Sequence, residues 1–243
     1  MSYAQTIMTS VTLNLRQVQG RIACACVAAQ RNVDSVTLLA VSKTFGADAV
    51  RQAHAGGQRA FGENYVQEAL DKIAALADLR PQLVWHLIGP LQSNKTRQVA
   101  EAFDWVQSVD RLKIAQRLSE QRPADLAPLQ VCLQVNISGE ASKSGLLPHQ
   151  VLALAQAVAL LPRLRLRGLM AIPEPAADLA AQRAPHRVLR ELLAALNDGG
   201  LTLDTLSMGM SADLEAAVAE GATLVRVGTA IFGGRASVAT PPG

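Results

Sequence analysis

The feature that constrains the fold most is a regular alternation of short apolar, β-prone runs with helical segments. Eight such runs occur, and helical periodicity follows each of them. The expected strands are 36–41, 59–61, 83–88, 105–108, 129–135, 164–172, 204–207 and 224–227. Strands that alternate with helices pair in parallel, and eight such units close a barrel at roughly 250 residues. The sequence therefore predicts an α/β fold, a single (β/α)8 TIM barrel.

One domain is expected to contain the whole chain. No linker or shift of composition divides residues 1–243. Apolar positions recur at helical spacing through residues 3–31, which predicts an amphipathic helix that covers one end of the core. Residues 239–243 are expected to be a frayed, flexible tail. A doubly wound open sheet is the alternative, but the Gly-x-Gly-x-x-Gly fingerprint after the first strand is absent.

The composition argues against several kinds of partner. The net charge is only +3, the arginines are scattered, and aromatic residues make up 3% of the chain, so no nucleic-acid surface is expected. No secretory signal or apolar run of membrane-spanning length is present, which favours a cytoplasmic protein without a membrane partner. Cys24 and Cys26 lie in an apolar helical pattern and are expected to be buried thiols, not metal ligands. A monomer is expected, because no coiled-coil stripe is evident.

Lys43 differs in its surroundings from the other lysines. It follows directly on the apolar strand expected at 36–41. Loss of water around an ammonium lowers its pKa and favours the neutral amine that Schiff-base chemistry needs. The alternative is a lysine that merely extends from a strand end into water. Solvation is a sufficient explanation for the lysines in polar helical or loop surroundings, which are Lys72, Lys95, Lys113 and Lys143.

Further polar residues fall where strands are expected to end, and barrels carry their active sites there. Asn64 follows the second strand, His86 lies near the end of the third, and Asn136 follows the fifth. His86 is open to two interpretations, a group at the barrel mouth or a hydrogen-bonded histidine of the core. Lys95 is equally open, as a solvated residue at a helix start or as a contact for phosphate groups.

Two glycine-containing turns close the seventh and eighth strands, where barrels often bind phosphate. Ser211 is expected to open the helix after the seventh strand, while Gly228 and Thr229 follow the eighth. A helix N-terminus offers unpaired N–H groups, and glycine lets backbone approach a ligand closely. Plain capping of a helix is the alternative for Ser211. The convergence of both turns on one point favours a phosphate site.

Arg226 interrupts the apolar run 224–227, where burial of an unpaired guanidinium would be costly. It either forms a buried ion pair with an acid that the sequence does not identify, or donates to a ligand heteroatom inside the barrel mouth. A lysine able to form an imine, a phosphate site and a buried donor together describe a site for pyridoxal 5′-phosphate.

A series of motifs in a fixed order extends along the chain. They occupy residues 40–44, 61–68, 86–95, 135–137, 142–145, 167–173, 206–211 and 225–233. On these motifs the chain resembles the YggS/PROSC family, the pyridoxal phosphate homeostasis proteins, along nearly all of its length. The resemblance implies a barrel like the N-terminal domain of alanine racemase. It also implies pyridoxal 5′-phosphate as the cofactor and apo pyridoxal phosphate-dependent enzymes as transient partners.

The resemblance also implies roles for individual residues. Lys43 carries the cofactor as an aldimine, and Arg226 faces the pyridine nitrogen. Ser211, Gly228 and Thr229 contact the phosphate. No residue is assigned to catalysis or to a metal. The complete set expected to bind the cofactor is Lys43, Asn64, Met210, Ser211, Arg226, Gly228 and Thr229.

Three functions are compatible with such a site. The favoured one is a non-catalytic binder that holds and releases pyridoxal phosphate in vitamin B6 homeostasis. The second is an amino-acid racemase of low activity, with Lys43 as one base and water or Tyr65 as the other. An arginine at the pyridine nitrogen makes the cofactor a poorer electron sink, and Tyr65 is expected to serve in packing. The third is a Schiff-base aldolase, in which lysine reacts with a substrate carbonyl and no cofactor is bound.

Overall fold

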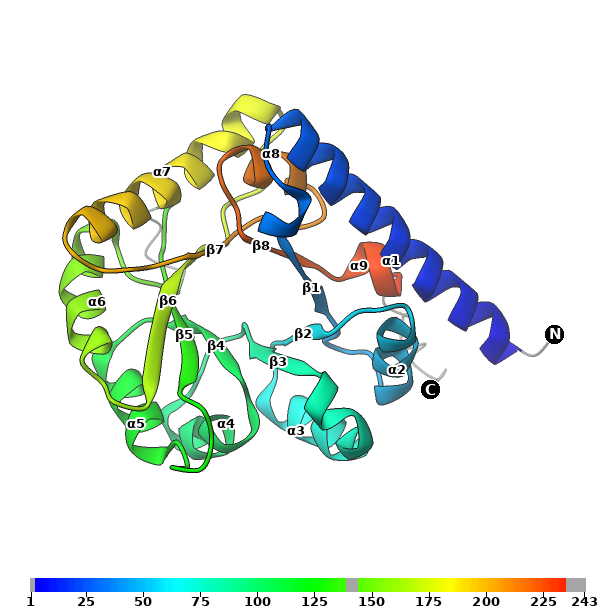
Figure 1. The fold of residues 1–243 in the computed structure, drawn as a ribbon, viewed down its shortest axis with the longest axis horizontal. Helices are drawn as coiled ribbons and strands as arrows, with labels where there is room; N and C mark the ends of the chain where they lie inside the picture. The colour runs from blue at the N-terminus through cyan, green and yellow to red at the C-terminus, as the bar shows by residue number, and fades with distance from the viewer. Residues whose placement is uncertain (1–2, 139–143, 235–243) are drawn as a thin grey trace, which may run out of the picture.

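The computed structural model describes residues 3–138 and 144–234 and shows a closed barrel of parallel strands (Figure 1). Strands that are neighbours in sequence pair with one another, and β8 pairs with β1 to close the ring. Each expected strand overlaps the observed one, so the prediction of a (β/α)8 barrel is confirmed. The strands are β1 (Thr37–Val41), β2 (Ala60–Glu63), β3 (Val84–Leu87), β4 (Trp105–Val109), β5 (Leu129–Gln134), β6 (Leu164–Met170), β7 (Thr205–Ser207) and β8 (Leu224–Val227).

A helix follows each strand and covers the outside of the barrel (Figure 1). Successive side chains of a strand point to opposite faces. Leu38 and Ala40 of β1 therefore pack among the helices, while Leu39 joins a separate small cluster inside the barrel. The helices are α2 (Ala47–Ala55), α3 (Val66–Ala75), α4 (Thr96–Ala102), α5 (Leu112–Gln121), α6 (Val151–Ala159), α7 (Leu179–Asp198), α8 (Leu214–Ala219) and α9 (Thr229–Phe232), with short 3-10 turns η1 (Val33–Ser35), η2 (Ala77–Gln82), η3 (Ser93–Lys95) and η4 (Pro148–Gln150).

The additional helix α1 (Tyr3–Ala28) runs along the outside of the barrel beside α2, α8 and α9 (Figure 1). Its apolar face is buried as predicted, through Val11, Leu15, Val18 and Ile22. The expectation of two buried thiols is wrong for Cys24, which is exposed, whereas Cys26 is buried. Residues two positions apart in a helix point to nearly opposite sides, so both thiols do not share the buried face. No helix within the described ranges is long and apolar enough to cross a membrane.

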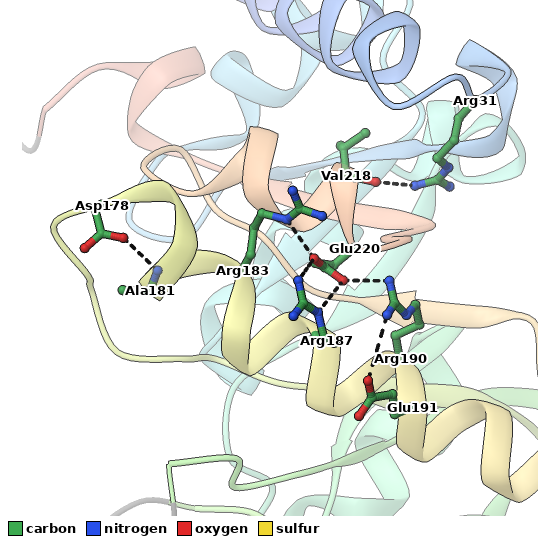
Figure 2. Close-up of polar contacts among 9 residues, drawn as sticks. All are labelled: Arg31, Asp178, Ala181, Arg183, Arg187, Arg190, Glu191, Val218 and Glu220. Atoms are coloured by element: carbon green, nitrogen blue, oxygen red, sulfur yellow. Dashed lines mark hydrogen bonds and ion pairs between the residues drawn. The ribbon is translucent and has the colours of Figure 1, made fainter.

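One buried carboxylate fixes α7 to the end of α8. The Glu220 side chain is 0% exposed and accepts hydrogen bonds from Arg183, Arg187 and Arg190 of α7 at 2.7, 3.0 and 2.6 Å (Figure 2). Burial by itself would raise the pKa of Glu220, but the hydrogen bonds from Arg187 and Arg183 outweigh it and hold the pKa below its ordinary value. The cluster therefore anchors the helix that follows the turn after β7.

Helical spacing in residues 176–197 predicts that Val188, Leu189, Leu192 and Leu196 face inwards, and α7 differs from this prediction in one position. Leu189 and Leu196 are buried as predicted, and His186 is buried beside them. Val188, which was expected to face inwards, is 43% exposed. The buried positions are spaced by three and seven residues, and Val188 lies off that stripe.

Candidate functional site

A cavity of about 340 Å³ opens at the carboxyl ends of the strands. Its volume lies in the range of small-molecule pockets. Larger cavities of about 480 and 700 Å³ lie at the amino ends of the strands and between α1, α7 and α8, and no lysine of the described residues lines either of them. A cavity of about 420 Å³ between α3 and the loop after β1 is lined by Lys72. All the residues expected to bind a cofactor line the first cavity, namely Lys43, Asn64, Met210, Ser211, Arg226, Gly228 and Thr229.

Lys43 and Arg226 reach this cavity from neighbouring strands. Lys43 is half-buried and follows the end of β1 by two residues. Arg226 lies in β8, where it is paired in register with Leu39 of β1. Closure of the barrel between the first and last strands thus brings an amine and a guanidinium to one pocket.

Arg226 is buried inside the barrel and donates to neutral acceptors. Its Nη1 donates to Ser207 Oγ and its Nη2 to the Ala171 carbonyl oxygen, both at 2.7 Å. Burial lowers the pKa of Arg226 to about 10, against the opposing charge of Asp213. The guanidinium therefore stays charged at neutral pH. It has five N–H donors, so donors remain for a ligand in the cavity that it lines.

Lys72 is not solvated, contrary to expectation. Its side chain is 6% exposed, and its Nζ lies 2.7 Å from Glu63 Oε1 and 2.7 Å from Glu68 Oε1. The same Nζ donates to the Ser42 carbonyl oxygen at 2.7 Å, and Ser42 Oγ donates to Glu63 at 2.6 Å. Burial raises the pKa of Glu63, although Lys72 and Ser42 oppose that shift. This cluster, of which only Glu68 is partly exposed, lies directly beside the Lys43 backbone.

Thr44, on the other side of Lys43, has a strained backbone. Its φ is 69°, in the left-handed region that a β-branched residue rarely adopts. Its N–H donates to Glu68 Oε1 at 2.5 Å. The hydrogen bond to α3 thus holds the residue after Lys43 in an unfavourable conformation.

The turn after β7 is built differently from the expectation. The helix begins at Leu214 and its N-cap position is Asp213, so Ser211 does not cap it. Asp213 Oδ1 accepts the Met210 N–H at 2.7 Å, and its Oδ2 lies 2.9 Å from His186 Nε2. Burial would raise the pKa of Asp213, but the contacts with His186 and the Met210 N–H outweigh it and lower the pKa. Asp213 thus organises the turn, and Ser211 lines the cavity.

Two further contacts fix this turn. Gly209 has φ of 92°, and a Cβ there would lie 2.5 Å from the Ala217 side chain, so only glycine fits. From α1, Arg21 Nη2 donates to the Ser211 carbonyl oxygen at 3.0 Å, and Arg21 also pairs with Glu215 at 2.9 Å. The additional helix therefore contributes to the site as well as to the core.

The turn after β8 passes close to β1. A Cβ at Gly228 would lie 3.0 Å from the Val41 carbonyl oxygen, so glycine permits this approach. The short helix α9 begins at Thr229, with Gly228 at its N-cap position. The first N–H groups of a helix have no partner within it. Backbone donors are thus available where Gly228 and Thr229 line the cavity.

Asn64 supplies a polar atom that the described residues leave unsatisfied. It follows β2, and its buried Oδ1 has no hydrogen-bond partner among them. The loop after β3 packs directly on its backbone, because a Cβ at Gly89 would lie 2.2 Å from the Asn64 carbonyl oxygen. A buried acceptor without a partner is costly unless a ligand or water satisfies it.

Four other residues considered in the sequence are not among those that line this cavity. His86 is buried inside the barrel, with Nδ1 2.9 Å from Gln107 Nε2, in agreement with a hydrogen-bonded core histidine. Lys95 ends the turn η3, and Asn136 is buried after β5. Tyr65 is 57% exposed, so the expectation that it serves in packing is wrong.

Sequence comparisons identify close relatives over nearly the whole chain. Residues 19–236 match the family model for the alanine racemase N-terminal domain. The pyridoxal phosphate homeostasis protein of Pseudomonas aeruginosa is 66% identical over 228 residues, which cover 94% of this chain and 97% of that protein. The protein of the same name from Escherichia coli K12 is 53% identical over 229 residues, with 94% and 98% covered.

Solved structures share the barrel. PipY of Synechococcus elongatus PCC7942, solved with pyridoxal phosphate bound, has a TM-score of 0.77 and 43% identity, covering 87% of this chain and 100% of its own. An unknown protein from Bifidobacterium adolescentis has a TM-score of 0.88 and 36% identity, with 93% and 96% covered. Alanine racemase from Corynebacterium glutamicum has a TM-score of 0.71 at 18% identity, covering 96% of this chain and 62% of its own, which is a likeness of fold alone.

Proposed function

This chain belongs to the family of pyridoxal phosphate homeostasis proteins, and on that premise we propose that it binds pyridoxal 5′-phosphate through Lys43 and holds it without catalysing a reaction. The observation that carries the proposal is that Lys43 and Arg226 line one cavity with the turns after β7 and β8. Bound pyridoxal phosphate supplies an aldehyde that condenses with a lysine amine. Lys43 is the residue that forms this bond.

The residues present fit the rest of the cofactor. Ser211 and Thr229 offer hydroxyl donors, and the first turn of α9 offers N–H groups, which suit a phosphate. Arg226 would donate toward the pyridine nitrogen; a guanidinium gives up no proton readily, so that nitrogen stays unprotonated. The unsatisfied Oδ1 of Asn64 would accept from a ligand donor. Met210 completes the wall beside Ser211.

A carrier is favoured over a racemase because the described residues that line the cavity include no second base. Racemisation needs proton acceptors on opposite faces of the bound substrate. Within the described chain, no tyrosine, histidine, aspartate, glutamate or cysteine lines the cavity, where Lys43 is the ionisable amine. Tyr65, the earlier candidate, is 57% exposed and is not among the lining residues. Lys43 would then bind and release the aldehyde without a second base to complete a racemisation.

The proposal includes the setting in which the protein works. We place it in the cytoplasm, as a monomer whose residues 1–243 form one domain and which meets apo pyridoxal phosphate-dependent enzymes transiently. The strands β1 to β8 form one closed barrel, which supports a single domain. Residues 239–243, the expected flexible tail, lie outside the described residues. Size-exclusion chromatography with light scattering tests the monomer, and a dimer mass would overturn it.

The visible spectrum tests the chemistry. We expect the wild-type protein to be yellow after incubation with pyridoxal phosphate, to lose the band on borohydride reduction, and to carry the pyridoxyl mass on Lys43. Lys43→Ala should lack the band, and Lys113→Ala, at an exposed position of α5, should retain it. A wild type that stays colourless with excess ligand would reject the cofactor and favour the aldolase. Racemisation of alanine or serine above the Lys43→Ala background would reject the non-catalytic role.

A further inference from the structure

The ammonium of Lys72 is fully satisfied, and its acceptors converge on the Lys43 backbone. Its three N–H donors face Ser42 O, Glu63 Oε1 and Glu68 Oε1, each at 2.7 Å. The Ser42 carbonyl belongs to the peptide unit before Lys43. The contact therefore connects the middle of α3 to the chain immediately preceding the amine that lines the cavity.

The peptide unit after Lys43 is held from the same helix. The Thr44 N–H donates to Glu68 Oε1, the oxygen that also faces Lys72. Both peptide units that flank Lys43 are thus bonded to one charge cluster, in which Lys72 and Glu63 are buried and Glu68 is partly exposed. Restraint of both peptide units fixes the direction of the Lys43 Cα–Cβ bond, from which the side chain reaches the cavity.

The conformation of Thr44 shows that these contacts act against a local preference. A threonine at φ of 69° persists only where its surroundings impose it. In this chain the Thr44 N–H donates to Glu68, which lies 2.7 Å from Lys72, and the Phe45 N–H closes a turn on the Ser42 carbonyl oxygen at 3.1 Å. Strain of this kind concentrates at functional sites, and here it lies one residue from Lys43.

We propose that Lys72 is a positioning residue for Lys43: through Ser42 and Glu68 it fixes both flanking peptide units and so aims the amine at the aldehyde carbon. The proposal rests on the proposed function, because the aim matters only where Lys43 reacts. In that reaction Lys43 gains a C=N bond and loses both amine protons to the carbonyl oxygen, which leaves as water. Correct aim raises the rate of bond formation.

A purely structural role for Lys72, as the counter-charge of buried Glu63, makes a different prediction. Its loss would then loosen the whole cavity, including the part that holds phosphate. A positioning role affects the bond to Lys43 and leaves non-covalent binding intact. The Lys43→Ala variant distinguishes the structural role of Lys72 from the positioning role, because it can bind the ligand only non-covalently.

The experiment compares Lys72→Met, Lys72→Arg and Glu68→Ala with the control Asp71→Ala, an exposed carboxylate on the same helix. The rate at which the yellow band forms with pyridoxal phosphate is measured by stopped flow. We expect it to fall about tenfold in Lys72→Met and about threefold in Glu68→Ala, with partial recovery in Lys72→Arg and no change in Asp71→Ala. In the Lys43→Ala background, Lys72→Met should leave the ligand affinity unchanged.

A second readout needs no ligand. Amide hydrogen exchange at Thr44 in the apo protein should accelerate in Lys72→Met and in Glu68→Ala, but not in Asp71→Ala. This readout distinguishes failure of the proposed function from failure of the positioning role. If the wild type never forms the yellow band, the proposed function is rejected. Exchange at Thr44 still shows whether Lys72 and Glu68 restrain the backbone.

Three results would overturn the positioning role. One is an unchanged rate of bond formation in a folded Lys72→Met protein, and another is an equal loss of affinity in the Lys43→Ala background. The third is unchanged Thr44 exchange in both variants. If Lys72→Met does not fold, Glu68→Ala carries the test, since Glu68 is 29% exposed and the Lys72–Glu63 pair remains. Wild-type rate and wild-type Thr44 exchange in that variant would then reject the proposal.

Discussion

The guanidinium of Arg226 donates to the Ser207 hydroxyl at 2.7 Å, and that hydroxyl donates to Gln107 Oε1 at 2.6 Å. Gln107 Nε2 in turn lies 2.9 Å from His86 Nδ1. A continuous chain of hydrogen bonds thus runs from the cavity to the middle of the barrel. Each hydrogen bond orients the next side chain in the series. The orientation of Arg226 therefore depends on residues that are not among those lining the cavity.

Ser207→Ala breaks this chain at its centre. We expect it to lower the free energy of unfolding by about 2 kcal/mol, because it leaves an Arg226 N–H and Gln107 Oε1 buried without partners. The affinity for pyridoxal phosphate should fall about tenfold, since Arg226 loses one of its two anchors. Urea unfolding and spectroscopic titration measure the two effects. Ser119→Ala, at a buried serine of α5, is the control, and equal affinity in both variants would contradict the role of the chain.

His86 should make folding stability depend on pH. Burial lowers the pKa of His86 to about 3 from an ordinary value of 6.5, so the folded protein keeps it neutral while the unfolded chain protonates it. Its contribution is complete above pH 6.5 and is lost as the pH falls toward 3, with a slope of up to about 1.4 kcal/mol per pH unit. His86→Gln should flatten the curve of unfolding free energy between pH 6 and 4. A variant with the wild-type slope would show that another group is responsible.

Glu220 and Glu191 offer a matched pair of carboxylates around Arg190 (Figure 2). Glu220→Gln should cost about 2–3 kcal/mol of unfolding free energy, because it removes a buried charge that three arginines share. Glu191→Gln should have almost no effect, since its side chain is 64% exposed and lies 3.9 Å from Arg190. Thermal and urea unfolding at pH 7 compare the two, and similar losses would refute the distinction.

The direction of the pKa shift of Glu220 can also be tested. A carboxyl with a depressed folded pKa contributes stability above its ordinary pKa of 4.5 and loses it as the pH falls through the folded value. The difference in unfolding free energy between wild type and Glu220→Gln should therefore be largest at neutral pH and shrink below pH 4.5. A difference that grows on acidification would contradict the lowered pKa.

Arg21 should specifically influence the part of the site that we propose to bind phosphate. It holds the Ser211 carbonyl from α1, so Arg21→Ala is expected to weaken pyridoxal phosphate binding by roughly threefold to tenfold through loss of one charge-assisted hydrogen bond. Binding of pyridoxal, which lacks the phosphate, should change little. Arg16→Ala, at an exposed position of the same helix, is the control. An equal loss for both ligands would place the effect of Arg21 elsewhere.

The fold was largely predictable because strand and helix periods are local signals. The alternation identified every strand of the barrel, and the apolar stripe of α1 was assigned correctly at Val11, Leu15 and Val18. Predictions of burial were wrong where the packing of a neighbouring helix or strand determines whether a side chain is buried. Val188 is an apolar residue of a type common in protein cores, but its position on α7 leaves it 43% exposed.

The candidate site was predictable only in part. Lys43 and Arg226 could be found because each breaks an apolar pattern at or beyond a strand. Lys72 was missed because a glutamate four residues before a lysine is typical of an exposed helix pair, and only the fold brings Glu63 beneath it. The hydrogen bonds of Gln107 and Asp213 could not be predicted, because their partners Ser207 and His186 lie on other elements. Asp213 could have been considered as a cap at the start of its helix.

The pairing of β1 with β8 makes the cavity a late product of synthesis. Lys43 is synthesised before Arg226, and the two residues share a pocket only when β8 pairs with β1. An incomplete nascent chain therefore displays a lysine without the guanidinium and the turns that surround a ligand. The complete cavity therefore forms only after β8 has been synthesised and has paired with β1.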